Sequence, residues 1–251
     1  MFTVAADAYD RFMGRYSAPL APLMADYARV VPGQRVVDVG CGPGAMTTEL
    51  VQRVGPEGVS AVDPSEPFVA AAKERHPGVD VRLASAEQLP FADDAFDASL
   101  AQLVVHFMAD PVKGLQEMGR VTRPGGVVAA CVWDHAGGTG PLSPFWEAAH
   151  SLDANVADES QLAGAREGHL SELFEQAGLR NVDEAALSVT LELASFDDWW
   201  APFTRGVGPA GAYMASLDAE QQARLRELCR YKFAASGLSQ TVRAWAARGV
   251  A

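Results

Sequence analysis

The sequence predicts an α/β fold built on a doubly wound, mostly parallel sheet. Short β-branched runs alternate with stretches of helical periodicity between residues 35 and 133, and successive runs start about 20–25 residues apart. The first of these runs leads directly into a glycine-rich loop, 40–44. Helices between strands supply the crossovers that parallel strands require, so this alternation favours a parallel sheet over an antiparallel one.

The elements up to residue 133 follow from this alternation. A first helix is predicted over 18–30, because apolar residues recur at helical spacing and Pro32-Gly33 follow. Glycine, proline and polar turns separate the later elements. We expect strands at 35–39, 58–62, 79–83, 97–104 and 127–133, and helices at 45–54, 66–75 and 111–121.

The pattern changes after residue 133. Residues 134–146 are rich in Gly, Pro and Ser and are predicted to form a long functional loop. A helix is expected at 168–178, a strand at 182–193 and a short last strand at 241–247. Only helical character is present over 196–236. We interpret that block as a helical lid inserted between the last two strands.

Composition and charge narrow the classes of function. The chain has 251 residues, of which 49% are hydrophobic, so it can bury a full core without disulfides. Its 20 basic and 32 acidic side chains give a net charge of −12, which repels nucleic-acid phosphates. Neither a secretory leader nor an apolar run of about 20 residues is visible. We expect a cytoplasmic protein with no nucleic-acid or membrane partner, either a monomer or a homodimer.

The cysteines do not predict a disulfide framework. The three residues are an odd number and lie far apart, at Cys41, Cys131 and Cys229. We expect all of them to be reduced. No paired Cys/His spacing occurs, so no metal site is predicted.

The glycine-rich loop allows two interpretations. Gly40, Gly42 and Ala45 match the dinucleotide pattern G-x-G-x-x-A, and Asp63 is suitably placed for a ribose hydroxyl. A nicotinamide-dependent oxidoreductase is consistent with these residues. Asp38, however, brings a carboxylate close to the loop, where it would repel a pyrophosphate and hold an amino group.

Further short sequence motifs follow the glycine-rich loop. Ser85-Ala86-Glu87 precedes Leu89-Pro90-Phe91, and Arg123-Pro124-Gly125-Gly126 precedes the fifth strand. With these residues the sequence resembles the class I S-adenosylmethionine-dependent methyltransferases, specifically the small-molecule group of type 11. The resemblance covers residues 36–133, and more loosely the N-terminal 9–17. It implies a Rossmann-like sheet of seven strands whose last strand is antiparallel.

The resemblance also implies how the chain is divided. Residues 1–251 would form a single methyltransferase domain, with cap helices at 1–32 and a donor-binding core at 33–133. An acceptor-side loop, helix and strand at 134–195, the lid at 196–236 and a final strand at 237–251 would follow.

The resemblance implies a donor site for S-adenosylmethionine, which leaves as S-adenosylhomocysteine. The loop Asp38–Gly44 would hold the methionine part, with Gly40, Cys41 and Gly42 in contact. Asp63, followed by Pro64, would accept the ribose hydroxyls. Ser85, Ala86 and Glu87 would follow the adenine, although the family usually has Asp where Ser85 stands. The Gln102 carbonyl would face the donor's amino group, and Tyr9 and Arg15 would close over the donor.

Two histidines are candidate catalytic residues. His106 follows the fourth strand and His135 follows the fifth, so both lie at the ligand-binding edge of the predicted sheet. Structural roles compete with these assignments: Asp63 could cap a helix, Cys41 could pack inside the loop, and both histidines could be non-catalytic. The leading hypothesis is methyl transfer to a small organic acceptor. The alternatives are an NAD(P)-dependent oxidoreductase and a non-catalytic donor-binding regulatory module.

Overall fold

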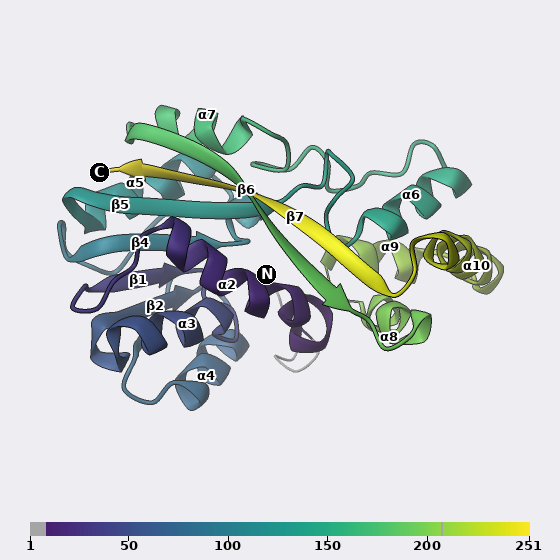
Figure 1. Ribbon diagram of the computed structural model, residues 1–251, viewed down its shortest axis with the longest axis horizontal. Coiled ribbons are helices and arrows are strands. Elements are labelled where there is room, and N and C mark those ends of the chain that lie inside the picture. The colour runs from purple at the N-terminus through teal and green to yellow at the C-terminus, as the bar shows by residue number, and fades with distance from the viewer. Residues whose placement is uncertain (1–8, 207) are drawn as a thin grey trace.

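A computed structural model describes residues 9–206 and 208–251 (Figure 1). Its centre is one seven-stranded sheet in the order β3-β2-β1-β4-β5-β7-β6. β7 is antiparallel to both of its neighbours, and the strands from β3 to β5 are mutually parallel. The strands are β1 (Val36–Val39), β2 (Val59–Asp63), β3 (Asp80–Leu83), β4 (Phe96–Gln102), β5 (Thr122–Trp133), β6 (Arg180–Glu192) and β7 (Ser239–Val250). The predicted fold class is confirmed.

Helices cover both faces of the sheet and its carboxyl edge. Five long helices flank the strands: α2 (Arg15–Tyr27), α3 (Ala45–Val54), α4 (Glu66–Arg75), α5 (Pro111–Val121) and α7 (His169–Gln176). The remaining α-helices are α6 (Ser143–Leu152), α8 (Phe196–Trp200), α9 (Gly208–Ser216) and α10 (Ala219–Ser236). Short turns complete the set: η1 (Asp10–Gly14), η2 (Pro56–Gly58), η3 (Val105–Phe107) and η4 (Ala201–Arg205). No helix of the described chain is long and apolar enough to cross a membrane.

Strand alternation determines what each face buries. In β5, Ala129, Cys131 and Trp133 belong to the cluster that α2 and α3 cover, whereas Val128, Ala130 and Val132 belong to the cluster that α5 and α7 cover. Successive strand residues point to opposite faces, so a run that is apolar at every position buries both faces. This is why β5 is apolar without interruption from Val127 to Trp133.

A third cluster lies beyond the carboxyl ends of the strands, on the right of Figure 1. It joins α6 to the helices inserted between β6 and β7, and Phe12 of η1 packs into it. The rings of Phe145 and Phe203 stack at 4.5 Å between centroids. Aromatic contacts of this kind hold the helical insertion against the sheet edge.

Several predicted boundaries were wrong. The first helix is Arg15–Tyr27 rather than 18–30, and the last strand is Ser239–Val250 rather than 241–247. The loop predicted over 134–146 ends earlier, because α6 begins at Ser143 with Pro144 in its first turn, a position where proline suits a helix. The fifth strand begins at Thr122 rather than at residue 127. Phe96 pairs with Thr122 and Ala98 with Val127, so the intervening residues 123–126 form a bulge within β5 rather than a turn before it.

The strand order reverses beside β1. β2 and β3 lie on one side of β1 and β4 lies on the other. Ligands of doubly wound sheets bind at this reversal, outside the carboxyl ends of the strands. The site therefore begins where β1, β2 and β4 end.

Candidate functional site

The loop after β1 packs closely against a neighbouring side chain at one of its glycines. Gly40, Gly42 and Gly44 all have positive φ angles, of 73°, 54° and 102°. A Cβ on Gly40 would lie 2.5 Å from the Val104 methyl carbons, whereas a Cβ on Gly42 would meet nothing within 4 Å. Glycine is therefore required at residue 40 by close packing, and the space above Gly42 is open to a ligand.

Asp38 and Gln102 each hold one buried oxygen without a partner. The Thr47 hydroxyl donates to Oδ2 of Asp38 at 2.6 Å, and the Gln102 amide nitrogen donates to the Ser17 carbonyl at 2.9 Å. Asp38 Oδ1 and Gln102 Oε1 have no hydrogen-bond partner among the described residues. Leaving a buried acceptor unpaired costs about 1–3 kcal/mol.

The two side chains lie on the same face of the sheet. Asp38 pairs in register with Leu100, and Gln102 lies two residues further along β4 on the same face. Burial raises the pKa of Asp38 to about 7. A bound cation would reverse that effect and would satisfy both oxygens, as an ammonium group with its three N–H donors can do.

Asp63 joins the ends of β1 and β2. Its carboxylate is 6% exposed and accepts the Gly42 N–H at 2.9 Å and the Ser65 N–H at 2.8 Å. Burial raises its pKa. Asp63 therefore supports both the glycine loop and the start of α4, and Pro64 lies exposed between them. Each oxygen keeps a second lone pair, which leaves ribose hydroxyls able to donate to it.

The predicted adenine segment forms a turn after β3. Ala86 is buried and packs on the α5 side of the sheet, and Ser85 is half-buried. The Glu87 carboxylate accepts the N–H groups of Ala109 at 2.8 Å and Asp110 at 3.4 Å. Glu87 thus fixes this turn to the start of α5. Its predicted role toward the donor stays a prediction.

Cys41 packs inside the glycine loop. Its side chain is 6% exposed and belongs to a small apolar cluster with α4 residues Val69 and Ala72. Burial raises the pKa of its thiol well above the ordinary value. A thiol in this environment is protonated at neutral pH and is a poor nucleophile.

Tyr9 and Arg15 make different contacts. The Tyr9 ring meets Phe68 edge-on at 5.4 Å. Burial, followed by the charge of Asp63, raises the pKa of Tyr9, so the phenol lies near Asp63. The Arg15 guanidinium instead holds both carboxylate oxygens of Asp198, at 2.9 and 3.3 Å. Arg15 joins the N-terminal segment to the first helix of the insertion.

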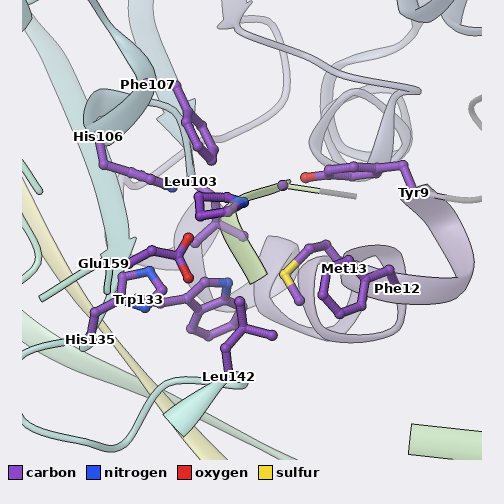
Figure 2. A pocket seen from close by; sticks show the side chains of 12 residues that line it. Tyr9, Phe12, Met13, Leu103, His106, Phe107, Trp133, His135, Leu142 and Glu159 are labelled. Atoms are coloured by element: carbon purple, nitrogen blue, oxygen red, sulfur yellow. The ribbon is translucent and has the colours of Figure 1, made fainter. Parts of the chain in front are cut away.

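A cavity of about 40 Å³ lies next to these residues, at the ends of β4 and β5 (Figure 2). Leu103, the residue after β4, adopts a φ of 63°, an uncommon conformation for a branched side chain. The cavity wall is mostly apolar, with three polar side chains. It comprises Tyr9, Phe12, Met13, Leu103, Phe107, Trp133, Leu142, Gly208 and Pro209, together with His106, His135 and Glu159.

Both predicted histidines reach this cavity. Their rings lie 5.9 Å apart. Burial lowers the pKa of His106 to about 3 and that of His135 to about 4. His106 Nδ1 and His135 Nε2 have no hydrogen-bond partner within the described chain. Both imidazoles are therefore neutral at pH 7.

Glu159 is the functional candidate that the sequence did not indicate. It is 4% exposed, and its carboxylate oxygens point into the cavity between His106 and Trp133 in Figure 2. The Trp146 indole donates to Oε2 at 2.9 Å, and burial raises the pKa of Glu159 to about 7. Its segment has no periodicity and no motif, so only the tertiary fold reveals its position.

Metal binding has no support in the part of the chain that the structure describes. No group of three or more His, Cys, Asp or Glu residues there could hold an ion.

Known proteins resemble this chain in sequence and in fold. Residues 37–130 match the model of a family described as a methyltransferase domain. One relative is the 2-methyl-6-phytyl-1,4-hydroquinone methyltransferase 2, chloroplastic, of Oryza sativa. The two sequences are 37% identical over 151 residues, and this matched region covers 59% of this chain and 39% of the rice protein. The chain spans less than half the length of the first curated relatives that it matches.

Solved structures share the fold over nearly the whole chain. A SAM-dependent methyltransferase from Thermotoga maritima matches with a TM-score of 0.55 and 20% identity, over 97% of this chain and 98% of that one. The cyclase SpnF matches with a TM-score of 0.58 and 19% identity, over 93% and 81% of the two chains. Likeness at such identities shows the fold alone. Residues 37–130 therefore carry a methyltransferase domain, and the fold of the chain is one seen in S-adenosylmethionine-dependent methyltransferases.

Proposed function

We propose that this protein transfers a methyl group from S-adenosylmethionine to a small organic acceptor. The observation that carries the proposal is the pair of unpartnered oxygens on Asp38 and Gln102, beside the open space at Gly42. The donor carries an ammonium group that fits this pair and ribose hydroxyls that fit Asp63. These residues are suited to the donor. They are not suited to a dinucleotide, whose negatively charged pyrophosphate would face the Asp38 carboxylate.

The residues on the donor side position and shield the reaction. When bound, the donor supplies a methyl group on a positively charged sulfur that leaves as a neutral thioether. Alignment of the reactants can supply about 7–11 kcal/mol of barrier reduction in well-oriented cases. In this proposal the core 33–133 holds the donor, and the segments 134–195 and 196–236 hold the acceptor and exclude water.

The acceptor side is the cavity at the ends of β4 and β5. Its aromatic and aliphatic wall suits a planar, largely apolar molecule. The cavity, of about 40 Å³, is partly open rather than sealed. The rice relative is named for a hydroquinone, and we therefore propose an aromatic ring with a hydroxyl group as the acceptor class.

Methyl incorporation tests the proposal. The protein is incubated with S-adenosylmethionine carrying a tritiated methyl group and a panel of 2-methylhydroquinone, 4-methylcatechol, aniline and thiophenol. We expect label in a hydroxyl-bearing aromatic and stoichiometric S-adenosylhomocysteine. Donor binding without label in any product would instead support a non-catalytic donor-binding module, and binding of NADH would support an oxidoreductase.

A further inference from the structure

Glu159 lies between two cavities of different character. The first is the apolar acceptor cavity described above. The second, of about 70 Å³, also contacts Glu159 and His135, but its other walls include the polar residues His150, Asp158 and Ser160. His150 Nε2 and Asp158 Oδ2 lie 2.9 Å apart, and both side chains are partly exposed. The second cavity thus brings Glu159 together with polar side chains that reach the surface.

We propose that Glu159 accepts the proton that a hydroxyl-bearing acceptor releases during methylation, and that the proton leaves through the second cavity. The inference rests on the proposed function, since it assigns the proton that methyl transfer would set free. It adds a catalytic residue for the hydroxyl-bearing acceptor class proposed above.

The step balances without a further reactant. A bond forms between the acceptor's hydroxyl oxygen and the methyl carbon, and the carbon–sulfur bond breaks with its electron pair passing to sulfur. The proton of the acceptor hydroxyl passes to a carboxylate oxygen of Glu159. It then passes toward Asp158 and His150 and is released to solvent.

The orientation of the carboxyl group favours this role. Trp146 donates to Oε2 and so fixes the carboxyl plane. Oε1 has no hydrogen-bond partner among the residues that the structure describes, and the carboxylate points into the acceptor cavity in Figure 2. One oxygen is therefore held by the protein and the other is available to a ligand.

The pKa values of the side chains around the cavity also favour Glu159 as the base. A general base works best when its pKa lies near the operating pH, and Glu159 has a pKa of about 7. His106 and His135, with pKa values of about 3 and 4, are much weaker bases. The titratable groups that share a cavity with Glu159 are Tyr9, His106, His135, Glu147, His150 and Asp158.

A binding experiment tests the inference without turnover. The protein, saturated with S-adenosylhomocysteine, is titrated with 4-cresol and with its methyl ether, 4-methylanisole, from about pH 6 to about pH 8. Cresol affinity should rise several-fold with pH as Glu159 loses its proton, because a carboxylate accepts a hydroxyl more strongly than a carboxylic acid does. The ether cannot donate a hydrogen bond and should show no rise.

Glu159→Gln is the informative variant. Glutamine keeps the volume and can still accept the Trp146 indole, so the fold should persist. Its cresol affinity should not change with pH. Glu172→Gln, the same change on an exposed face of α7, should behave as the wild type. A pH-independent wild-type affinity, the same rise in Glu159→Gln, or no saturable cresol binding would each overturn the inference.

Kinetics supply a second test with any panel member that is methylated. Glu159→Gln should lower kcat by about 10²-fold or more with unchanged affinity for S-adenosylhomocysteine. Added formate should restore part of the rate of Glu159→Ala. If the wild type does not bind S-adenosylhomocysteine, the proposed function itself is refuted. If the donor product binds and Glu159→Gln keeps the full rate, only the role of Glu159 is refuted.

Discussion

The Gly42 amide donates a hydrogen bond of 2.9 Å to the carboxylate of Asp63, 21 residues further along the chain. This bond joins the glycine loop after β1 to the end of β2, the two segments expected to contact opposite ends of the donor's ribose-methionine portion. The second oxygen of Asp63 accepts the Ser65 N–H. One buried carboxylate therefore holds together both sides of the proposed donor site.

Asp63→Ala should weaken both donor binding and folding. The change removes the ribose acceptor and leaves the Gly42 and Ser65 N–H groups without their partner. We expect donor affinity to fall by more than ~1 kcal/mol, and the free energy of unfolding to fall by about 1–3 kcal/mol. Calorimetric titration and urea unfolding measure the two effects. Unchanged donor affinity would remove Asp63 from the ribose site.

Donor affinity should depend on the protonation of Asp38. Its pKa of about 7 lies above its unfolded value, so folding favours the protonated form and this carboxyl destabilises the fold as pH rises from about 4 to about 7. A bound ammonium favours the carboxylate instead. S-adenosylhomocysteine affinity should therefore rise up to about tenfold per pH unit below pH 7 and then level off.

Asp38→Asn is the matched variant for that titration, since it keeps the shape and can still accept from Thr47. The rise in affinity with pH should be absent in Asp38→Asn. An equal rise in both proteins would assign the titration to another group.

Arg15 and Asp198 should act as a pair. Their bidentate contact is partly exposed, so its coupling energy should be about 0.2–1 kcal/mol in a double-mutant cycle of unfolding. Because Arg15 is held by Asp198, Arg15→Ala and Asp198→Ala should affect donor affinity equally. If Arg15→Ala alone weakened donor binding, Arg15 would contact the donor directly, as the resemblance implied.

His135→Ala should slow turnover and leave donor affinity unchanged. His135 lines the acceptor cavity, and no contact joins it to the glycine loop among the described residues. Its pKa of about 4 keeps the ring neutral, so the loss should appear at all pH values between about 6 and 8. Initial rates with a methylated acceptor and calorimetry with S-adenosylhomocysteine check this. An unaltered rate would make His135 a non-catalytic loop residue.

Trp146→Phe should raise the pKa of Glu159 further. The indole N–H stabilises the carboxylate, and phenylalanine keeps an aromatic ring but removes that donor. The midpoint of the pH dependence of 4-cresol affinity should therefore move to higher pH. A midpoint that stays in place or moves to lower pH would show that the indole does not stabilise the Glu159 carboxylate.

Local signals were sufficient for most of the fold. The helices at 45–54, 66–75 and 111–121 have the predicted bounds, because Gly44, Ser65 and Asp110 precede them at their N-caps. The start of α6 was missed because the glycine and proline content of the preceding segment is typical of a loop. The strand content of β5 was underestimated because a proline and two glycines lie inside its bulge.

The site was only partly predictable for a related reason. Residues at the ends of strands share one edge of a parallel sheet, so Asp38, Asp63, Gln102 and the two histidines could be grouped from sequence. Glu159 and the Arg15–Asp198 pair depend on contacts between segments that no local pattern connects. Arg15 and Asp198 lie 183 residues apart. Such contacts arise only once the helical insertion packs on the sheet edge.

Calorimetric titration of the purified protein with S-adenosylmethionine, S-adenosylhomocysteine and NADH in parallel tests the central claim most directly. We predict micromolar binding of the first two, weakened in Asp63→Ala and in Gln102→Leu, and no binding of NADH. Binding of NADH alone would contradict the assignment of the loop after β1, of Asp38 and of Gln102 to a methyl donor.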